Sequence, residues 1–86
     1  MKLSDYITQL ASFHQITFTK GDMDYISSMM NFIPYDIRYD VARQYIDVWA
    51  TAMAECTNPI RAMNTGRRAA NIYLRELIDE RNSEVL

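Results

Sequence analysis

Apolar residues recur every three or four positions along most of the chain, which is the spacing of one face of an α-helix. In the first such stretch, Leu3, Ile7 and Leu10 share a face. Ser4 is suited to begin this helix because its hydroxyl can accept a hydrogen bond from a free backbone amide of the first turn. The pattern predicts a helix over about residues 4–14.

A second helix start is marked by a pair of residues that can cap each other. Thr19 and Asp22 have the spacing of a capping box, in which each side chain accepts a hydrogen bond from the other residue's backbone. Apolar residues then continue on one stripe until Pro34, which disfavours helical geometry at the residue before it. The second helix is predicted at 20–32.

The third apolar stretch is the widest in the chain. Pro34 suits a first helical turn, and the periodic pattern continues from there to about Cys56. An apolar arc this wide indicates a helix that packs against two neighbours, so we expect this helix at the centre of the fold. Two adjacent rows form the arc: Ile37, Val41, Tyr45, Val48 and Ala52, beside Ala42, Ile46, Trp49 and Met53.

The last helical region leaves two alternatives open. Asn58 and Pro59 form a strong start signal, an N-cap followed by proline at the first helical position. Gly66 interrupts the pattern and costs about 1 kcal/mol relative to alanine inside a helix. The sequence is compatible with one helix at 59–82, or with a short turn followed by a helix at 66–82.

These elements predict an all-α fold, a three- to four-helix bundle with short loops and a single domain over residues 1–86. The composition agrees, since 49% of the 86 residues are hydrophobic and only 2 Gly and 2 Pro are present. No segment approaches the roughly 20 apolar residues that cross a bilayer. The single Cys56 excludes a disulfide within the chain, so we expect a soluble, cytoplasmic protein without membrane contact.

The sequence offers little for catalysis. His14 is the only histidine and Cys56 the only cysteine, which is too few for a zinc tetrad. The two glycines, Gly21 and Gly66, do not form a phosphate-binding loop. The carboxylates do not follow a calcium-loop pattern. We therefore expect no enzymatic activity, no metal and no cofactor.

The sharpest charged feature is a basic segment on an acidic chain. Residues 58–75 contain four arginines and no acid, although the whole chain has a net charge of −2. Arg61, Arg68 and Arg75 are spaced by seven residues, so a continuous helix places them on one stripe. Such arginines bind phosphates or carboxylates in bidentate fashion, or they pair with acids of the same chain. The acidic total favours a protein partner over nucleic acid.

A second candidate contact lies near the start of the third helix. Tyr35 and Tyr39 are four residues apart with Arg38 between them, on the flank away from the apolar rows. Tyrosine and arginine are enriched among residues that dominate binding energy at protein interfaces. Together with the arginines, these residues give the predicted partner-binding set: Tyr35, Arg38, Tyr39, Arg67, Arg68 and Arg75.

Residues 66–77, GRRAANIYLREL, together with Ile33-Pro34 and the segment 41–45, VARQY, carry a resemblance. They resemble helical segments of accessory and replication-region proteins of temperate tailed phages. The resemblance implies binding to a host or defence complex, in some such proteins as an inhibitor, and in others binding to DNA.

The leading prediction is a non-catalytic helical module that binds another protein, with self-association as a homodimer as one form of it. The alternative is a small DNA-binding regulator in which the third helix and the arginine-bearing helix form a helix-turn-helix-like pair.

Overall fold

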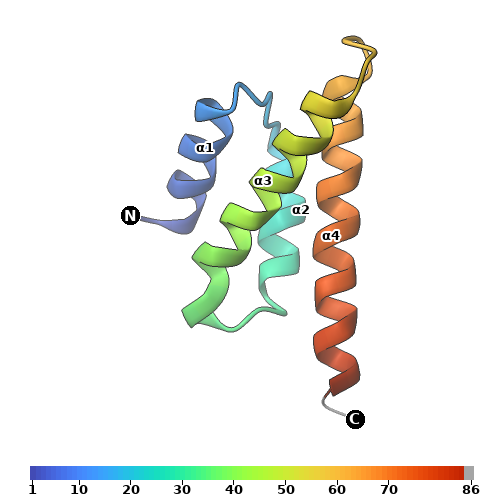
Figure 1. The fold of residues 1–86 in the computed structure, drawn as a ribbon. Coiled ribbons are helices and arrows are strands. Elements are labelled where there is room, and N and C mark those ends of the chain that lie inside the picture. The colour runs from blue at the N-terminus through green and yellow to red at the C-terminus, as the bar shows by residue number, and fades with distance from the viewer. Residues whose placement is uncertain (85–86) are drawn as a thin grey trace.

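The structure is a computed structural model that describes residues 1–84, and those residues form helices joined by short loops (Figure 1). No strand occurs in this part of the chain. The all-α bundle predicted from the sequence is confirmed. Its helices are α1 (Leu3–Phe13), α2 (Lys20–Met30), α3 (Arg38–Glu55) and α4 (Ala62–Glu84), with a 3-10 turn, η1 (Tyr35–Ile37), before α3.

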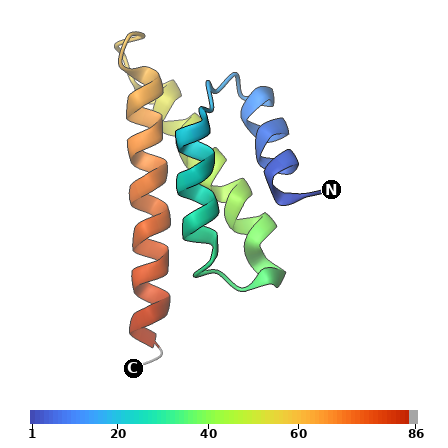
Figure 2. The same cartoon turned by 180° about the vertical axis from the view of Figure 1, so that it is seen from behind.

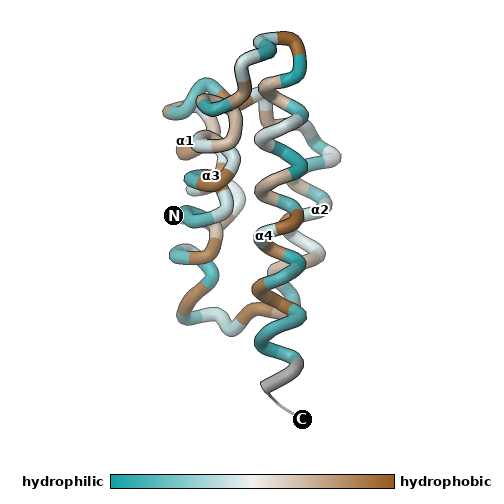
Figure 3. The backbone as a smooth tube through the Cα atoms, turned by 45° about the vertical axis from the view of Figure 1, so that its right-hand side comes forward, coloured by the Kyte–Doolittle hydropathy of each residue, from teal (hydrophilic) through white to brown (hydrophobic). Residues whose placement is uncertain are grey.

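Helix α3 lies at the centre, as its wide apolar arc predicts. It runs antiparallel to α4, to which residues 56–61 connect it, and α1 packs against its other flank (Figure 1). Viewed from behind, α2 lies across α3 between α1 and α4 (Figure 2). Along each helix, short hydrophobic and hydrophilic stretches follow one another (Figure 3). At helical spacing this pattern gives each helix one apolar side to bury.

The core draws on all four helices. Its largest side chains come from α3, where Tyr45, Ile46 and Trp49 are fully buried. The other helices add apolar side chains to the same cluster, among them Ile7, Ile26, Ala70 and Leu74. Burial of these side chains is the main stabilising term for a chain of this size.

The starts of the first two helices show one confirmed and one wrong prediction. The capping box of α2 is present: the Asp22 amide donates to Thr19 Oγ1 at 3.2 Å, and the Thr19 amide donates to Asp22 Oδ2 at 2.9 Å. Ser4 is not the N-cap of α1, which begins at Leu3 after Lys2. The Ser4 carbonyl instead accepts a hydrogen bond from the Thr8 hydroxyl, one turn later in the helix.

Helix α4 resolves the alternatives left open at Gly66. The helix runs through Gly66 without a break, although it begins at Ala62 and not at Pro59. The Asn58 side chain accepts a hydrogen bond from the Ile60 amide at 3.0 Å, which forms a turn in residues 58–61 in place of a helix start. At Gly66 an added Cβ would lie 2.7 Å from the Trp49 carbonyl oxygen. Glycine at this position therefore lets α4 approach α3 closely.

Candidate functional site

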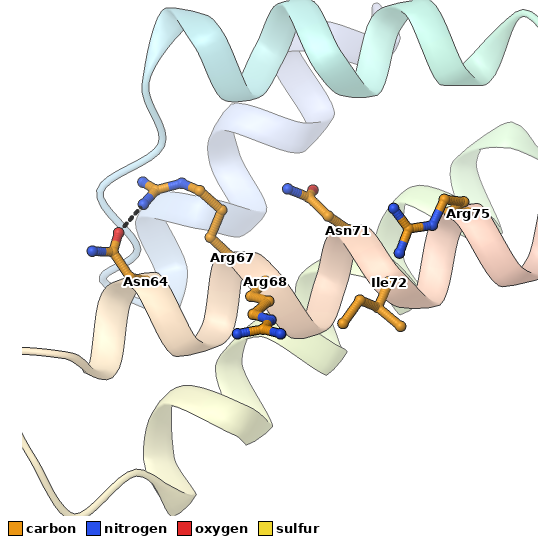
Figure 4. A pocket seen from close by; sticks show the side chains of 6 residues that line it. All are labelled: Asn64, Arg67, Arg68, Asn71, Ile72 and Arg75. Atoms are coloured by element: carbon orange, nitrogen blue, oxygen red, sulfur yellow. Dashed lines mark hydrogen bonds between the residues drawn. The ribbon is translucent and has the colours of Figure 1, made fainter.

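A groove of about 410 Å³ lies along the outer side of α4 (Figure 4). Arg67 and Asn71 lean toward α2, Arg68 and Ile72 project on the other side, and the Arg75 side chain lies along α4. All its lining residues come from α4, at spacings of three or four residues that form adjoining rows along the helix. They are Asn64, Arg67, Arg68, Asn71, Ile72 and Arg75, so the groove joins the three arginines that the sequence singled out.

Arg67 is held inside the protein. Its Nε donates to Asp22 Oδ1 at 2.7 Å and its Nη2 donates to Asp22 Oδ2 at 3.2 Å. Nη1 donates to Asn64 Oδ1, and the guanidinium lies 5.0 Å from the centre of the Trp49 ring. All three nitrogens are therefore used within the chain. Arg67 therefore pairs with an acid of its own chain, 45 positions earlier in the sequence, and its predicted contact with a partner stays a prediction.

Asp22 is the buried acid of this pair, with 6% of the residue exposed. Burial alone would raise its pKa, but hydrogen bonds from Arg67 and from the Thr19 amide and hydroxyl hold the pKa below its ordinary value of 3.8. The Asp22–Arg67 pair thus joins the start of α2 to the first half of α4. The two charged groups of this pair bind each other and so connect the two helices.

The lowered pKa gives a testable pH dependence. A carboxyl whose pKa is lower in the folded than in the unfolded protein stabilises the fold above pH 4, and this contribution is lost as the pH falls through the lowered folded value. We expect the difference in unfolding free energy between the wild type and Asp22→Asn to shrink steadily below pH 4. Urea titrations of both proteins at a series of pH values measure it, and a difference that does not change with pH would contradict it.

The other two arginines of the groove are available. Arg68 and Arg75 are exposed, and neither forms an ion pair with any residue whose side chain the structure describes, residues 1–82. The amide oxygens beside them are already used: Asn71 Oδ1 accepts from the buried Tyr45 hydroxyl at 2.5 Å, and Asn64 Oδ1 accepts from Arg67. Burial raises the pKa of Tyr45, so its hydroxyl stays protonated and donates. The groove consequently offers hydrogen-bond donors.

The second predicted surface forms where η1 meets α3. Residue Tyr35 is 84% exposed, and the Arg38 guanidinium carbon lies 3.9 Å from the centre of its ring. Arg38 Nε also donates to the Ile33 carbonyl at 2.8 Å. Arg38 is therefore fixed in orientation by a backbone acceptor and by an aromatic ring, while the outer face of Tyr35 is open to solvent.

Two further residues extend this surface, and one of them was missed in the sequence. Tyr39 donates its hydroxyl to the Met1 carbonyl and packs its ring 5.2 Å from the Tyr6 ring, so it is only partly available. Phe32 is 61% exposed, because α2 ends at Met30, two residues before the predicted end. We call Phe32, Tyr35, Arg38 and Tyr39 the aromatic corner.

The remaining chemically reactive side chains do not assemble. His14 Nε2 lies 3.9 Å from Asp47 Oδ1, and the Cys56 thiol donates to the Asn58 carbonyl at 3.4 Å. Over residues 1–84, no group of three or more His, Cys, Asp or Glu side chains is arranged to hold a metal ion. None of the helices in that range has the length and apolar character needed to cross a membrane.

Comparisons with known proteins do not add to this picture. No protein-family model, no curated protein and no solved structure matches the chain.

Proposed function

We propose that this protein is a non-catalytic module that binds another protein through the aromatic corner. The observation that carries the proposal is Tyr35, a residue that is 84% exposed and has the Arg38 guanidinium over one face of its ring. A large aromatic side chain that contributes almost nothing to the core has its apolar surface available for a partner.

The corner has the chemistry of a binding hot spot. Tyrosine and arginine are over-represented among residues whose truncation weakens protein complexes most. Arg38 is ordered before any partner arrives, since its Nε is already bound to the Ile33 carbonyl, and less conformational entropy is lost on binding. The exposed acids Asp36 and Asp40 lie on the same segment, so a protein partner suits this corner better than a phosphate backbone.

The wider setting is part of the same proposal. The resemblance of residues 66–77 to segments of phage accessory proteins supports a phage- or prophage-encoded protein that binds and inhibits a host or defence complex. A chain with the single Cys56 suits the reducing cytoplasm.

The proposal is tested by capture from a cell that naturally produces the protein. We expect Tyr35→Ala with Arg38→Ala to lose a co-purifying protein that the wild-type chain retains, because the variant removes both members of the stacked pair. Phe13→Ala is the matched control: Phe13 is 81% exposed, and it ends α1 at the other end of the bundle from η1 (Figure 1). Mass spectrometry of the eluates gives the readout.

Two results would count against this use of the corner. One is an identical set of captured proteins for the wild type and the double variant. The other is an equal loss of the captured protein in Phe13→Ala, which would indicate general stickiness of exposed aromatic residues. Circular dichroism of each variant verifies that its helices are retained.

The free arginines of α4 favour a second candidate, a DNA-binding regulator. Arg68 and Arg75 point away from the core and can contact phosphates. Helices α3 and α4 form a long antiparallel hairpin, so this candidate depends on the arginines and not on a helix-turn-helix crossing. Retention on duplex DNA that weakens steeply with salt would support it, and no retention at low salt would exclude it.

A further inference from the structure

We propose that the groove of α4 binds the outer face of α3 in a second copy of this chain. This inference concerns a different surface from the aromatic corner and does not depend on the proposed function. It rests on the hydrogen-bonding character of the groove, on the acids of α3 and on the spacing of both.

The groove requires an occupant that supplies acceptors. Arg68 and Arg75 contribute only N–H donors, and the amide oxygens of Asn64 and Asn71 are already used within the chain. Ionised carboxylates are acceptor-only groups and match the fork geometry of arginine. A carboxylate-bearing surface therefore satisfies this groove.

The outer face of α3 supplies such a surface. Asp40 and Asp47 are both exposed and are seven residues apart on one side of the helix. Asp47 has only long contacts within the chain, with Arg43 at 3.4 Å and with His14 at 3.9 Å. Exposed ion pairs of this kind contribute little and exchange readily for better partners.

The two stripes have the same period. Arg68 and Arg75 are separated by seven residues of α4, as Asp40 and Asp47 are in α3, and seven residues of α-helix rise by about 10.5 Å. Two helices lying side by side can therefore place both carboxylates against both guanidiniums at once. Within one chain the stripes do not meet, because neither arginine forms an ion pair with any described residue.

Apolar atoms lie beside the charges on both surfaces. Ile72 lines the groove of α4 between the two arginines. On α3, Val48 and Ala52 line a separate hollow of about 320 Å³ next to Asp47. Burial of these atoms would add to the ion pairs, whose contribution in water is small. Since the contact joins unlike surfaces, a pair of copies leaves the stripe of one copy and the groove of the other unoccupied, so further copies can add.

The test uses two charge-reversed variants and their mixture. One carries Arg68→Glu and Arg75→Glu, and the other carries Asp40→Lys and Asp47→Lys. We expect the wild type to associate as its concentration rises and to dissociate when salt is raised from about 0.05 to 0.5 M. Each variant alone should sediment as a monomer, and an equimolar mixture should associate, because one intact groove then faces one intact stripe.

A matched control exchanges an ion pair outside both surfaces. Lys20→Glu with Asp24→Lys swaps the exposed pair of α2, 3.0 Å apart, and should associate like the wild type. Neutral variants, Arg68→Gln with Arg75→Gln, should also be monomeric and guard against misfolding of the reversed forms. Circular dichroism monitors helix content throughout.

Three outcomes would overturn the inference: a wild type that stays monomeric at every concentration, variants that still associate, or a mixture that remains monomeric. A monomeric wild type whose α4 arginines bind an acidic peptide or duplex DNA would assign the groove to that occupant. Because the arginine variants of α4 leave the aromatic corner and its acids Asp36 and Asp40 unchanged, capture through Tyr35 is measured in those variants and can succeed or fail independently.

Discussion

Replacing Arg67 with methionine is expected to lower the free energy of unfolding by about 3 kcal/mol. The substitution keeps most of the side-chain volume but leaves the Asp22 carboxylate, 6% exposed, without the two hydrogen bonds that balance its desolvation. Loss of one partner of a buried ion pair typically costs about 3–5 kcal/mol. The lower value is expected here because 27% of the Arg67 side chain is exposed to water. Urea unfolding at neutral pH measures the change.

A companion variant separates the unpaired charge from the lost packing. Asp22→Asn combined with Arg67→Met removes both charges, so it should recover much of the stability lost in Arg67→Met alone. Arg68→Met, on the same helix but exposed, should change the unfolding free energy by less than about 0.5 kcal/mol. Equal stability of Arg67→Met and Arg68→Met would show that the Asp22–Arg67 pair does not hold α2 against α4.

Gly66→Ala should destabilise the protein by about 2 kcal/mol, against the gain that alanine normally brings inside a helix. The added Cβ would lie 2.7 Å from the Trp49 carbonyl oxygen and 2.8 Å from Trp49 Nε1. The carbonyl belongs to the backbone of α3 and the indole is fully buried, so neither can move without separating the two helices. Thermal and urea unfolding give the readout.

The other glycine provides the control for this prediction. At Gly21 the nearest atom to an added Cβ is Thr19 Oγ1 at 3.6 Å, an ordinary contact distance. Gly21→Ala should therefore raise the unfolding free energy by about 0.5–1 kcal/mol, since it adds helix propensity in the first turn of α2. A Gly66→Ala variant as stable as the wild type would mean that α3 and α4 are not packed as closely as described.

Much of the fold followed from local patterns, because helix periodicity and capping depend on neighbouring residues. The Thr19–Asp22 box and the wide arc of α3 are local features of this kind. The role of Gly66 depends on which residue of another helix lies against it. The sequence by itself indicates only that glycine lowers helix stability at this position. The sequence therefore left open whether α4 continues through Gly66, because the reason for a glycine there is the close contact with Trp49 of another helix.

The surroundings of the candidate residues were harder to predict than the helices. Arg67 was grouped with the outward arginines, yet it is rotated by about 100° from Arg68 and aligns with the buried Leu74 and Ile78 at helical spacing. That alignment was a usable signal, although its partner Asp22 could not be found without the tertiary fold. The exposure of Phe32 also escaped prediction, because the apolar stripe continues past the residue where α2 ends.

The most direct test of the account is a footprint of the captured partner on this chain. Amide resonances of the isotope-labelled protein are followed as the purified partner is added. We expect shifts concentrated in residues 32–39, with the side-chain signals of Tyr35 and Arg38 among the largest, and little change at the end of α1. Shifts confined to α1 or to the α4 groove, with residues 32–39 unchanged, would contradict the assignment of the aromatic corner as the binding surface.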